Sequence, residues 1–287
     1  MNEIKDKTFG GERPLFETHN TKLINVTITD GESAVKHCSD MVADSCHFYG
    51  KYPWWHVDRS LIINTYFAPE SRSAIWYSND LCMKDSIIDG PKFFREMENL
   101  SLENVTINDA DETFWRVKNL KVKNVVLHGG TYPFMFSENI EVDGLESDAK
   151  YVFQYCKNVE VRNARIVTKD SFWECENVTI RDSVLDGEYL AWHSKNVRLI
   201  NCHLAGEQLL CYVDGLVLEN CTFDKDCDRV FEYSNDIEAD IQGSITNIKN
   251  PTSGHIVADE IGSITIDENI RQPANCTIEE RVKKLKG

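Results

Sequence analysis

The sequence has no run of about 18 consecutive apolar residues, the length that a transmembrane helix needs, so we expect no membrane-spanning helix. Residues 1–8 are charged and contain no apolar core, which argues against a secretory signal peptide. We therefore predict a cytoplasmic protein whose ten cysteines stay reduced. No stretch rich in proline, glycine or serine divides the chain, and we predict a single domain over residues 1–287.

Basic residues are also few, because 31 lysines and arginines stand against 47 acidic residues, for a net charge of −16. Such an acidic surface argues against binding to nucleic-acid phosphates and against docking on anionic membranes. The sequence lacks HxH, HExxH and CxxC phrases, and Gly10-Gly11 is too short for a phosphate loop. We predict neither a metal nor a cofactor.

What the chain does have is an internal repeat. A phrase of the form Asn-apolar-x-apolar-x-Asn, as in residues 99–104, recurs along most of the sequence, and its first apolar residue marks each copy. The marks follow one another at intervals of 19 to 21 residues, at Met41, Leu61, Leu81, Leu100, Leu120, Ile140, Val159, Val178, Val197, Leu216 and Ile237. Apolar residues that alternate with a period of two indicate a strand with one buried face.

Each copy is too short to bury its own apolar side, so neighbouring copies have to stack, at about 4.8 Å per coil. We predict an all-β fold, a parallel β-helix of about 12 coils with 19–20-residue repeats over residues 21–267. Residues 1–20 are expected to cap one end, and residues 268–287 to form a tail or a short helix that starts at Thr277.

Other positions of the repeat support this register. Six residues before the mark, large apolar side chains are expected to stack inside as a ladder, formed by Trp55, Phe94, Phe114, Phe134, Phe153, Phe172, Leu210 and Phe231. Two residues before the mark, the sign of the charge alternates through Glu98, Lys118, Glu138, Lys157, Glu176, Lys195 and Asp214. Alternation is expected when each residue lies directly over its counterpart, because like charges would repel.

Bends and cysteines also follow the repeat. Asparagine columns, such as Asn99, Asn119 and Asn139, mark bends, since asparagine tolerates the left-handed conformation. Most cysteines fall in inward columns and are interpreted as small core residues: Cys38, Cys46, Cys156, Cys175, Cys202 and Cys221.

Several phrases resemble those of a bacterial family, domain of unknown function 3737. Among them are Gly-Glu-Arg-Pro-Leu-Phe (11–16), Lys-Tyr-Pro-Trp-Trp (51–55), Pro-Lys-Phe-Phe-Arg-Glu (91–96), Gly-Glu-Tyr-Leu-Ala-Trp (187–192) and Lys-Asn-Pro-Thr-Ser-Gly (249–254). The resemblance covers nearly the whole chain. It implies a right-handed parallel β-helix related in architecture to pectate lyases, and it supplies no activity and no catalytic residues.

The repeat does not require outward-facing tryptophans, yet two adjacent columns, five and four residues before the mark, are rich in aromatic and charged residues. We predict that they form an exposed stripe that binds a carbohydrate or a similar polyhydroxylated ligand, with Arg95 between Trp76 and Trp115. The candidate ligand-binding residues on the stripe and on the loop before it are Trp76, Arg95, Trp115, Arg116, Trp173, Trp192, His193, Arg72, Lys92, Glu112 and Tyr189.

Whether the chain is an enzyme stays open at this point. Asp170 with Glu174 or Glu188 can approach closely enough for a pair of glycosidase carboxylates, and one of them would then act as an acid. Lys169 with Glu188, or Arg116 with Glu96, offers the base and the charge neutraliser of a lyase. The alternative is a non-catalytic scaffold whose stripe binds another protein or a second copy of the chain, as in a homo-oligomer.

Overall fold

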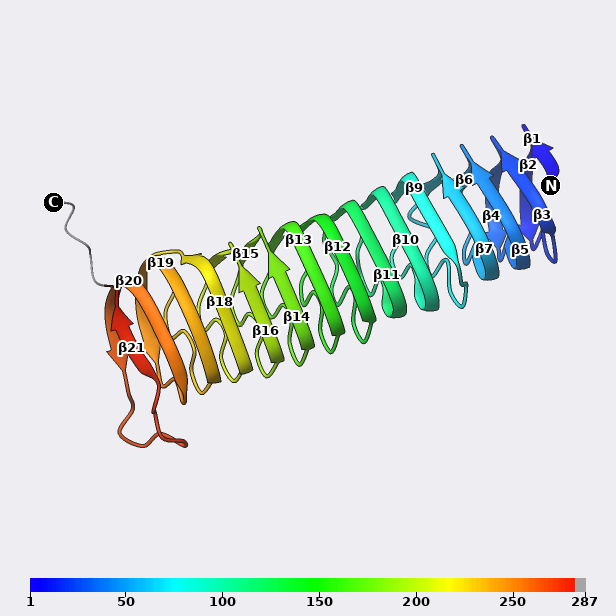
Figure 1. Cartoon of the computed structure of the whole chain (residues 1–287). Coiled ribbons are helices and arrows are strands. Elements are labelled where there is room, and N and C mark those ends of the chain that lie inside the picture. Colours follow the sequence, from blue (N-terminus) through cyan, green and yellow to red (C-terminus); the bar gives the residue numbers. More distant parts are fainter. Residues whose placement is uncertain (282–287) are drawn as a thin grey trace. The chain divides into compact units, whose positions relative to one another are not determined.

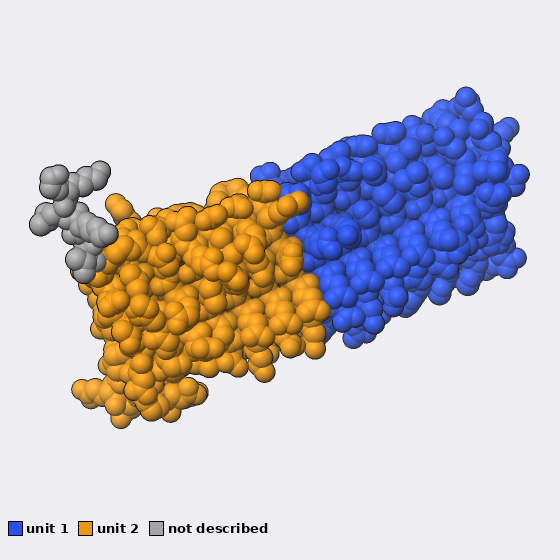
Figure 2. All heavy atoms as spheres, in the orientation of Figure 1, with its two compact units in different colours: residues 1–149 blue, residues 150–287 orange. Residues whose placement is uncertain are grey.

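The structure, a computed structural model, describes residues 1–281. The chain forms two compact units, residues 1–149 and 150–287 (Figure 2), and each unit is described by itself. Both units consist of parallel strands that lie side by side as successive rungs (Figure 1). Residues 1–281 contain no helix, and therefore none that could span a membrane.

The strands are two to 15 residues long, and paired residues of successive coils lie about 20 positions apart in the sequence. In unit 1 they are β1 (Asn2–Lys5), β2 (Thr8–Glu12), β3 (His19–Ile24), β4 (Thr27–Glu32), β5 (Val35–Asp44), β6 (His47–Phe48), β7 (Trp54–Ile63), β8 (Tyr66–Phe67), β9 (Leu81–Ile88), β10 (Arg95–Ile107), β11 (Trp115–Leu127) and β12 (Glu138–Ser147). In unit 2 they are β13 (Lys157–Val167), β14 (Glu176–Arg181), β15 (Val184–Asp186), β16 (Lys195–Ile200), β17 (His203–Ala205), β18 (Asp214–Phe223), β19 (Asn235–Lys249), β20 (Gly254–Thr265) and β21 (Thr277–Glu280).

The register of the strands confirms the predicted columns. In unit 1, Leu100 of β10 pairs with Leu81 of β9 and with Leu120 of β11. In unit 2, Val197 of β16 pairs with Val178 of β14 on one side, and with Leu216 of β18 on the other. The fold is an all-β solenoid of parallel strands, as predicted, with about 15 turns where the sequence suggested 12.

The difference in the number of turns arises at the two termini. The expected cap over residues 1–20 is wrong, because β1 and β2 form a further coil in which Ile4 pairs with Leu23 and Phe9 with Ile28. The expected short helix from Thr277 is also wrong. Residues 277–280 form β21, which pairs with β20 and places Ile278 over Ile256, whereas residues 282–287 lie outside the described residues. Continuation of the buried column and of the strand pairing outweighs the small gain of a capped helix.

One coil of unit 1 is shifted by a residue from its predicted register. Ser60, not Leu61, pairs with both Met41 and Leu81. The inward ladder residue of this coil is therefore Trp54, which is fully buried, while Trp55 turns outward. The intervals from Met41 to Ser60 and from Ser60 to Leu81 are 19 and 21 residues, where the sequence suggested 20 and 20. Both pairs of intervals add up to the same length, so the marks on either side do not distinguish them.

The rest of the inward ladder is confirmed, because each of the predicted Phe residues and Leu210 is buried. Phe114 stacks on Phe94 at 5.3 Å and on Phe134 at 4.7 Å between ring centroids. In unit 2, Phe153 and Phe172 stack at 4.8 Å. The cysteines interpreted as core residues are buried free thiols, and burial raises the pKa of Cys38 and Cys46.

Hydrogen-bonded asparagine side chains line the bends. Asn99, Asn119 and Asn139 adopt φ values of 60°, 57° and 58°, in the left-handed region that asparagine tolerates. Each side chain donates from Nδ2 to the residue one coil earlier, so Asn139 bonds to Asn119, Asn119 to Asn99, and Asn99 to Asp80. The ladder begins at an aspartate, which accepts hydrogen bonds and has no donor to offer, and a second ladder likewise begins where Asn104 donates to Asp85.

The alternating charges are stacked as predicted. Lys118 pairs in register with Glu98 and with Glu138, and its Nζ lies 3.3 Å from Glu138 Oε1. In unit 2, Glu176 pairs with Lys157 and with Lys195. These exposed contacts contribute little energy each, but they fix which rungs are neighbours.

Candidate functional site

The aromatic stripe exists in both units, at the bend that precedes each mark-bearing strand. In unit 1 the inner of its two columns runs through Lys36, Trp55, Trp76, Arg95 and Trp115, which pair in succession. Trp55 therefore belongs to this column, and His56 belongs to the outer one. The same slip in register that moved Trp54 inward is the reason.

Ring faces in unit 1 are covered by their neighbours along the column. Trp55 and Trp76 stack at 5.3 Å with an interplanar angle of 9°. The guanidinium carbon of Arg95 lies 4.7 Å from the ring centroid of Trp76 and 4.8 Å from that of Trp115, as predicted for a cation between two aromatic faces. A ligand that approaches from solvent therefore meets ring edges.

The polar groups of the unit 1 stripe pair with one another. Arg95 Nη1 lies 2.7 Å from Glu112 Oε2, and Lys92 Nζ lies 3.2 Å from the same oxygen. Arg116 forms an ion pair with Glu96 at 3.2 Å. Arg72 is exposed, and its backbone carbonyl accepts a hydrogen bond from the Tyr52 amide.

The outer column of unit 1 presents a second stack of rings. His37 and His56 lie parallel at 4.8 Å, and Tyr77 stacks on His56 at 5.0 Å. Burial, and then the neighbouring His37 and Lys36, lower the pKa of His56. Sequence reasoning omitted His37, His56 and Tyr77 from the candidate residues, although their spacing of 19 and 21 residues carried the signal.

Unit 2 carries the same two columns with different pairing. Gln154, Trp173, Trp192 and Cys211 succeed one another in the inner column, as the backbone hydrogen bonds of their following residues show. Trp173 and Trp192 are tilted by 30° with their centroids 6.1 Å apart, so they do not stack as Trp55 and Trp76 do. Tyr189 meets Trp192 edge-on at 5.1 Å, which brings the predicted loop residue against the stripe. In the outer column, His193 stacks on Tyr212 at 4.7 Å.

Asp170 lies on the loop that leads into the stripe. It adopts φ 55°, and its backbone N–H donates to the carbonyl of Glu188 at 2.8 Å, which places the predicted carboxylates on adjacent rungs. Burial raises the pKa of Asp170, the neighbouring Lys169 opposes this rise, and Glu188 adds to it. One carboxyl of the predicted pair therefore holds its proton more firmly than an ordinary aspartate does.

Three carboxylates of the unit 2 stripe and of the loop before it lack partners among the described residues. Within residues 1–281, the side chains of Asp170, Glu174 and Glu188 make no hydrogen bond or ion pair. The amide of Glu174 donates to the carbonyl of Trp192, so this residue lies one rung from the second tryptophan. Lys169 lies with its Nζ 5.9 Å from the ring centroid of Tyr151. We call Asp170, Trp173, Glu174, Glu188, Tyr189 and Trp192 the unit 2 cluster.

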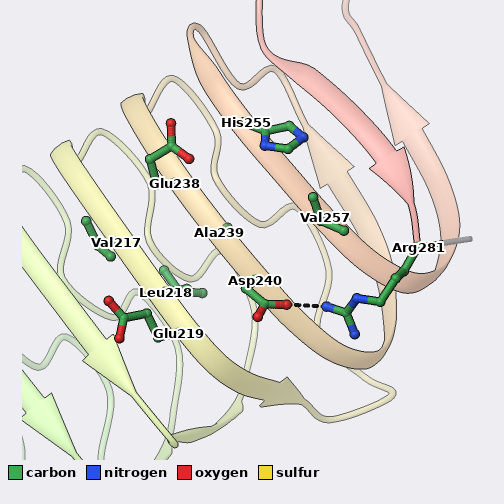
Figure 3. A pocket seen from close by; sticks show the side chains of 9 residues that line it. All are labelled: Val217, Leu218, Glu219, Glu238, Ala239, Asp240, His255, Val257 and Arg281. Atoms are coloured by element: carbon green, nitrogen blue, oxygen red, sulfur yellow. Dashed lines mark hydrogen bonds and ion pairs between the residues drawn. The ribbon is translucent and has the colours of Figure 1, made fainter.

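A separate hollow of about 420 Å³ lies on β18, β19 and β20 of unit 2 (Figure 3). It is lined by Val217, Leu218, Glu219, Glu238, Ala239, Asp240, His255, Val257 and Arg281. Arg281 reaches Asp240 across the hollow, and it donates to Asp259 at 2.6 Å. Sequence reasoning missed this hollow. Its sequence signal was Val217 and Val257, which lie where the neighbouring coils carry Arg198 and Asp240.

Among residues 1–281, no group of three or more His, Cys, Asp or Glu side chains is placed to hold a metal ion. The unit 2 cluster itself contains several kinds of polar and aromatic side chain. These offer carboxylates, a phenol and indole edges for hydrogen bonds, and one carboxyl with a raised pKa.

Comparisons with known proteins place the chain in a family. A family model described as "Protein of unknown function (DUF3737)" matches residues 2–279. No match is found among curated proteins.

Two solved structures are distantly similar. The catalytic domain of a GH87 alpha-1,3-glucanase in complex with tetrasaccharides has a TM-score of 0.35 and 11% identity, over 98% of this chain and 64% of that one. This chain thus spans less than two thirds of the glucanase chain. QnrB1, a plasmid-mediated fluoroquinolone resistance protein, has a TM-score of 0.25 and 14% identity, over 78% of this chain and 92% of that one. Similarities this low carry no argument about function.

Proposed function

This chain belongs to the DUF3737 family, and we propose that it binds a carbohydrate or a similar polyhydroxylated ligand at the unit 2 cluster. The observation that carries the proposal is Asp170, a half-buried carboxyl that has no partner within residues 1–281 and whose pKa is raised by burial. A partly buried polar group without a partner needs an explanation. One explanation known from other proteins is that a ligand binds to it.

A polyhydroxylated ligand fits the groups that the cluster offers. Ligand hydroxyls donate to carboxylates such as Glu174 and Glu188, while the exposed edges of Trp173 and Trp192 contribute apolar contact. The two units differ in this respect, because the charged groups of unit 1 are engaged with one another. We therefore propose the unit 2 cluster as the main ligand-binding site. The unit 1 residues that the sequence predicted to bind the ligand come second, namely Trp76, Arg95, Trp115 and their charged neighbours.

Catalysis is an extension of the same proposal. Asp170 would donate a proton to a leaving oxygen, and Glu188 would serve as the second carboxylate of a hydrolase. Lys169 with Glu188 would instead serve a lyase. Both assignments use side chains that the structure places on adjacent rungs.

A glycan array with the full chain tests binding, and variants then test the site. We expect Asp170→Asn and Glu188→Gln to weaken binding, and to abolish turnover if the bound glycan is cleaved. Glu96→Gln, in the ion pair of unit 1, is the matched control and should leave both unchanged. An array without any bound glycan would refute the proposal.

The second candidate is a non-catalytic scaffold that binds a protein. The stacked faces of Trp55 and Trp76 favour it, because rings packed against each other stabilise the coil and leave little surface for a sugar. Under this alternative, acrylamide quenching of tryptophan fluorescence should not change when sugars are added, and pull-down with the intact chain should recover a partner that Trp76→Ala no longer binds.

A further inference from the structure

The indole nitrogens of Trp55, Trp76 and Trp192 have a structural role. A side chain of the inner column donates to a backbone carbonyl in the loop of the next coil, eight residues before the next mark. Trp55 Nε1 donates to the Ser73 carbonyl and Trp76 Nε1 to the Lys92 carbonyl, both at 2.7 Å. Each of these hydrogen bonds links the loop of one coil to the stripe of the coil before it.

Unit 2 follows the same rule with three different donors. Gln154 Nε2 donates to the carbonyl of Asp170 at 3.2 Å, and Trp192 Nε1 donates to that of Gln208 at 2.7 Å. The thiol of Cys211 is 3.5 Å from the carbonyl oxygen of Arg229, the weakest of these contacts. The rule therefore holds for an amide, an indole and a thiol.

Trp173 is the exception within unit 2. Its Nε1 is covered and has no hydrogen-bond partner among the described residues, although its ring is only half-buried. By the rule, its acceptor should be the carbonyl of Tyr189, which accepts no hydrogen bond from residues 1–281 either. This donor and this acceptor lie on adjacent coils, at positions that bond to each other elsewhere in the stripe, yet they make no hydrogen bond to each other.

Asp170 lies in the same loop column as Tyr189, on the neighbouring rung, where its amide donates to the Glu188 carbonyl. An oxygen placed between Trp173 and Tyr189 would accept from the indole N–H, and a hydroxyl group there would at the same time donate to the Tyr189 carbonyl or to Asp170. Hydroxyls have one proton to donate and two lone pairs to accept with, so they fit such a set of partners.

We infer that the Trp173 N–H and the Tyr189 carbonyl form a subsite for one hydroxyl group of the ligand, with Trp173 as the residue that recognises it. This inference rests on the proposed function, and it names the contact that would distinguish a ligand with a hydroxyl at this position from one without. A covered donor without a partner costs free energy. The hydroxyl reaches Nε1 when the indole turns outward, and the new hydrogen bond removes that cost.

The test compares two Trp→Phe variants from the same column. Trp173→Phe removes an indole N–H that makes no bond, whereas Trp55→Phe removes one that bonds to Ser73 and lies outside the unit 2 cluster. In urea unfolding, Trp55→Phe should lower the midpoint more than Trp173→Phe does. Equal losses would overturn the inference, because they would mean that the Trp173 N–H already has a partner such as an ordered water.

Binding is measured by titrating the chain, with ¹⁵N-labelled indoles, with cellohexaose and maltohexaose as neutral probes. We expect the Trp173 indole signal to shift, and Trp173→Phe to weaken binding about tenfold, the loss of one hydrogen bond. Trp55→Phe should bind like the wild type. If the probes bind while the Trp173 signal and the Trp173→Phe affinity stay unchanged, the subsite is wrong and the proposed function stands. If neither the probes nor a glycan array show binding, the proposed function fails, and the subsite with it.

Discussion

The asparagine ladder of unit 1 gives a prediction that can be worked out quantitatively. Asn119 donates to Asn99 and accepts from Asn139, each at 2.9 Å, and its φ of 57° is left-handed. Asn119→Ala removes both bonds, about 1 kcal/mol each at most for exposed groups. It also places alanine in a conformation that costs roughly 1 kcal/mol. We expect a loss of about 2–3 kcal/mol in the free energy of unfolding.

The direction of the ladder adds a sharper comparison. Asn119→Asp keeps the acceptor for Asn139 but loses the donor to Asn99, so it should cost about 1–2 kcal/mol. Asp80→Asn, at the first rung, keeps the oxygen that accepts from Asn99, and should stay within about 0.5 kcal/mol of the wild type.

Urea unfolding followed by both circular dichroism and tryptophan fluorescence measures these differences, and coincident transitions would validate the two-state treatment. The reasoning would be refuted if Asn119→Ala cost less than about 0.5 kcal/mol. It would also be refuted if Asp80→Asn were as harmful as Asn119→Asp, since the polarity of the ladder would then be irrelevant.

Three further predictions concern the core and the titrating groups. Phe114→Ala should destabilise the chain by about 3–5 kcal/mol in the same assay, because it opens a cavity between two stacked rings; a loss below about 1 kcal/mol would contradict a packed ladder. The pKa of Asp170 is raised in the folded state, so its contribution to stability is fully present below the unfolded pKa of about 3.9 and is lost as the pH rises through the folded value. Asp170→Asn should therefore be more stable than the wild type at pH 7, with a difference that vanishes below about pH 4, as thermal unfolding across pH will show. Glu103 bridges Lys84 and Lys123, which lower its pKa to about 2. Its contribution to stability is present above the unfolded pKa of about 4.3 and is lost as the pH falls toward about 2, so the difference between Glu103→Gln and wild type should shrink with acid and with salt.

Much of the site could be anticipated from position in the repeat alone. Arg95 between Trp76 and Trp115 follows from their places in one column, since stacked coils bring residues 19 or 20 positions apart into contact. The adjacency of Asp170 and Glu188 follows in the same way. The error at Trp54 and Trp55 shows the weakness of this reasoning, because two adjacent tryptophans fit either register and only backbone pairing separates them.

The sequence by itself determined the architecture, since a period of 19 to 21 residues with alternating apolar positions can bury its core only by stacking. It also determined which residues share a column, apart from one coil and the two termini. Only the tertiary structure decided which groups of the stripe are already paired and which are not. Whether the indole of Trp173 bonds to a loop carbonyl, or how deeply Asp170 is buried, depends on ring tilt and loop path. Ring tilt and loop path arise from packing between neighbouring coils, and the spacing of residues in the sequence does not predict them.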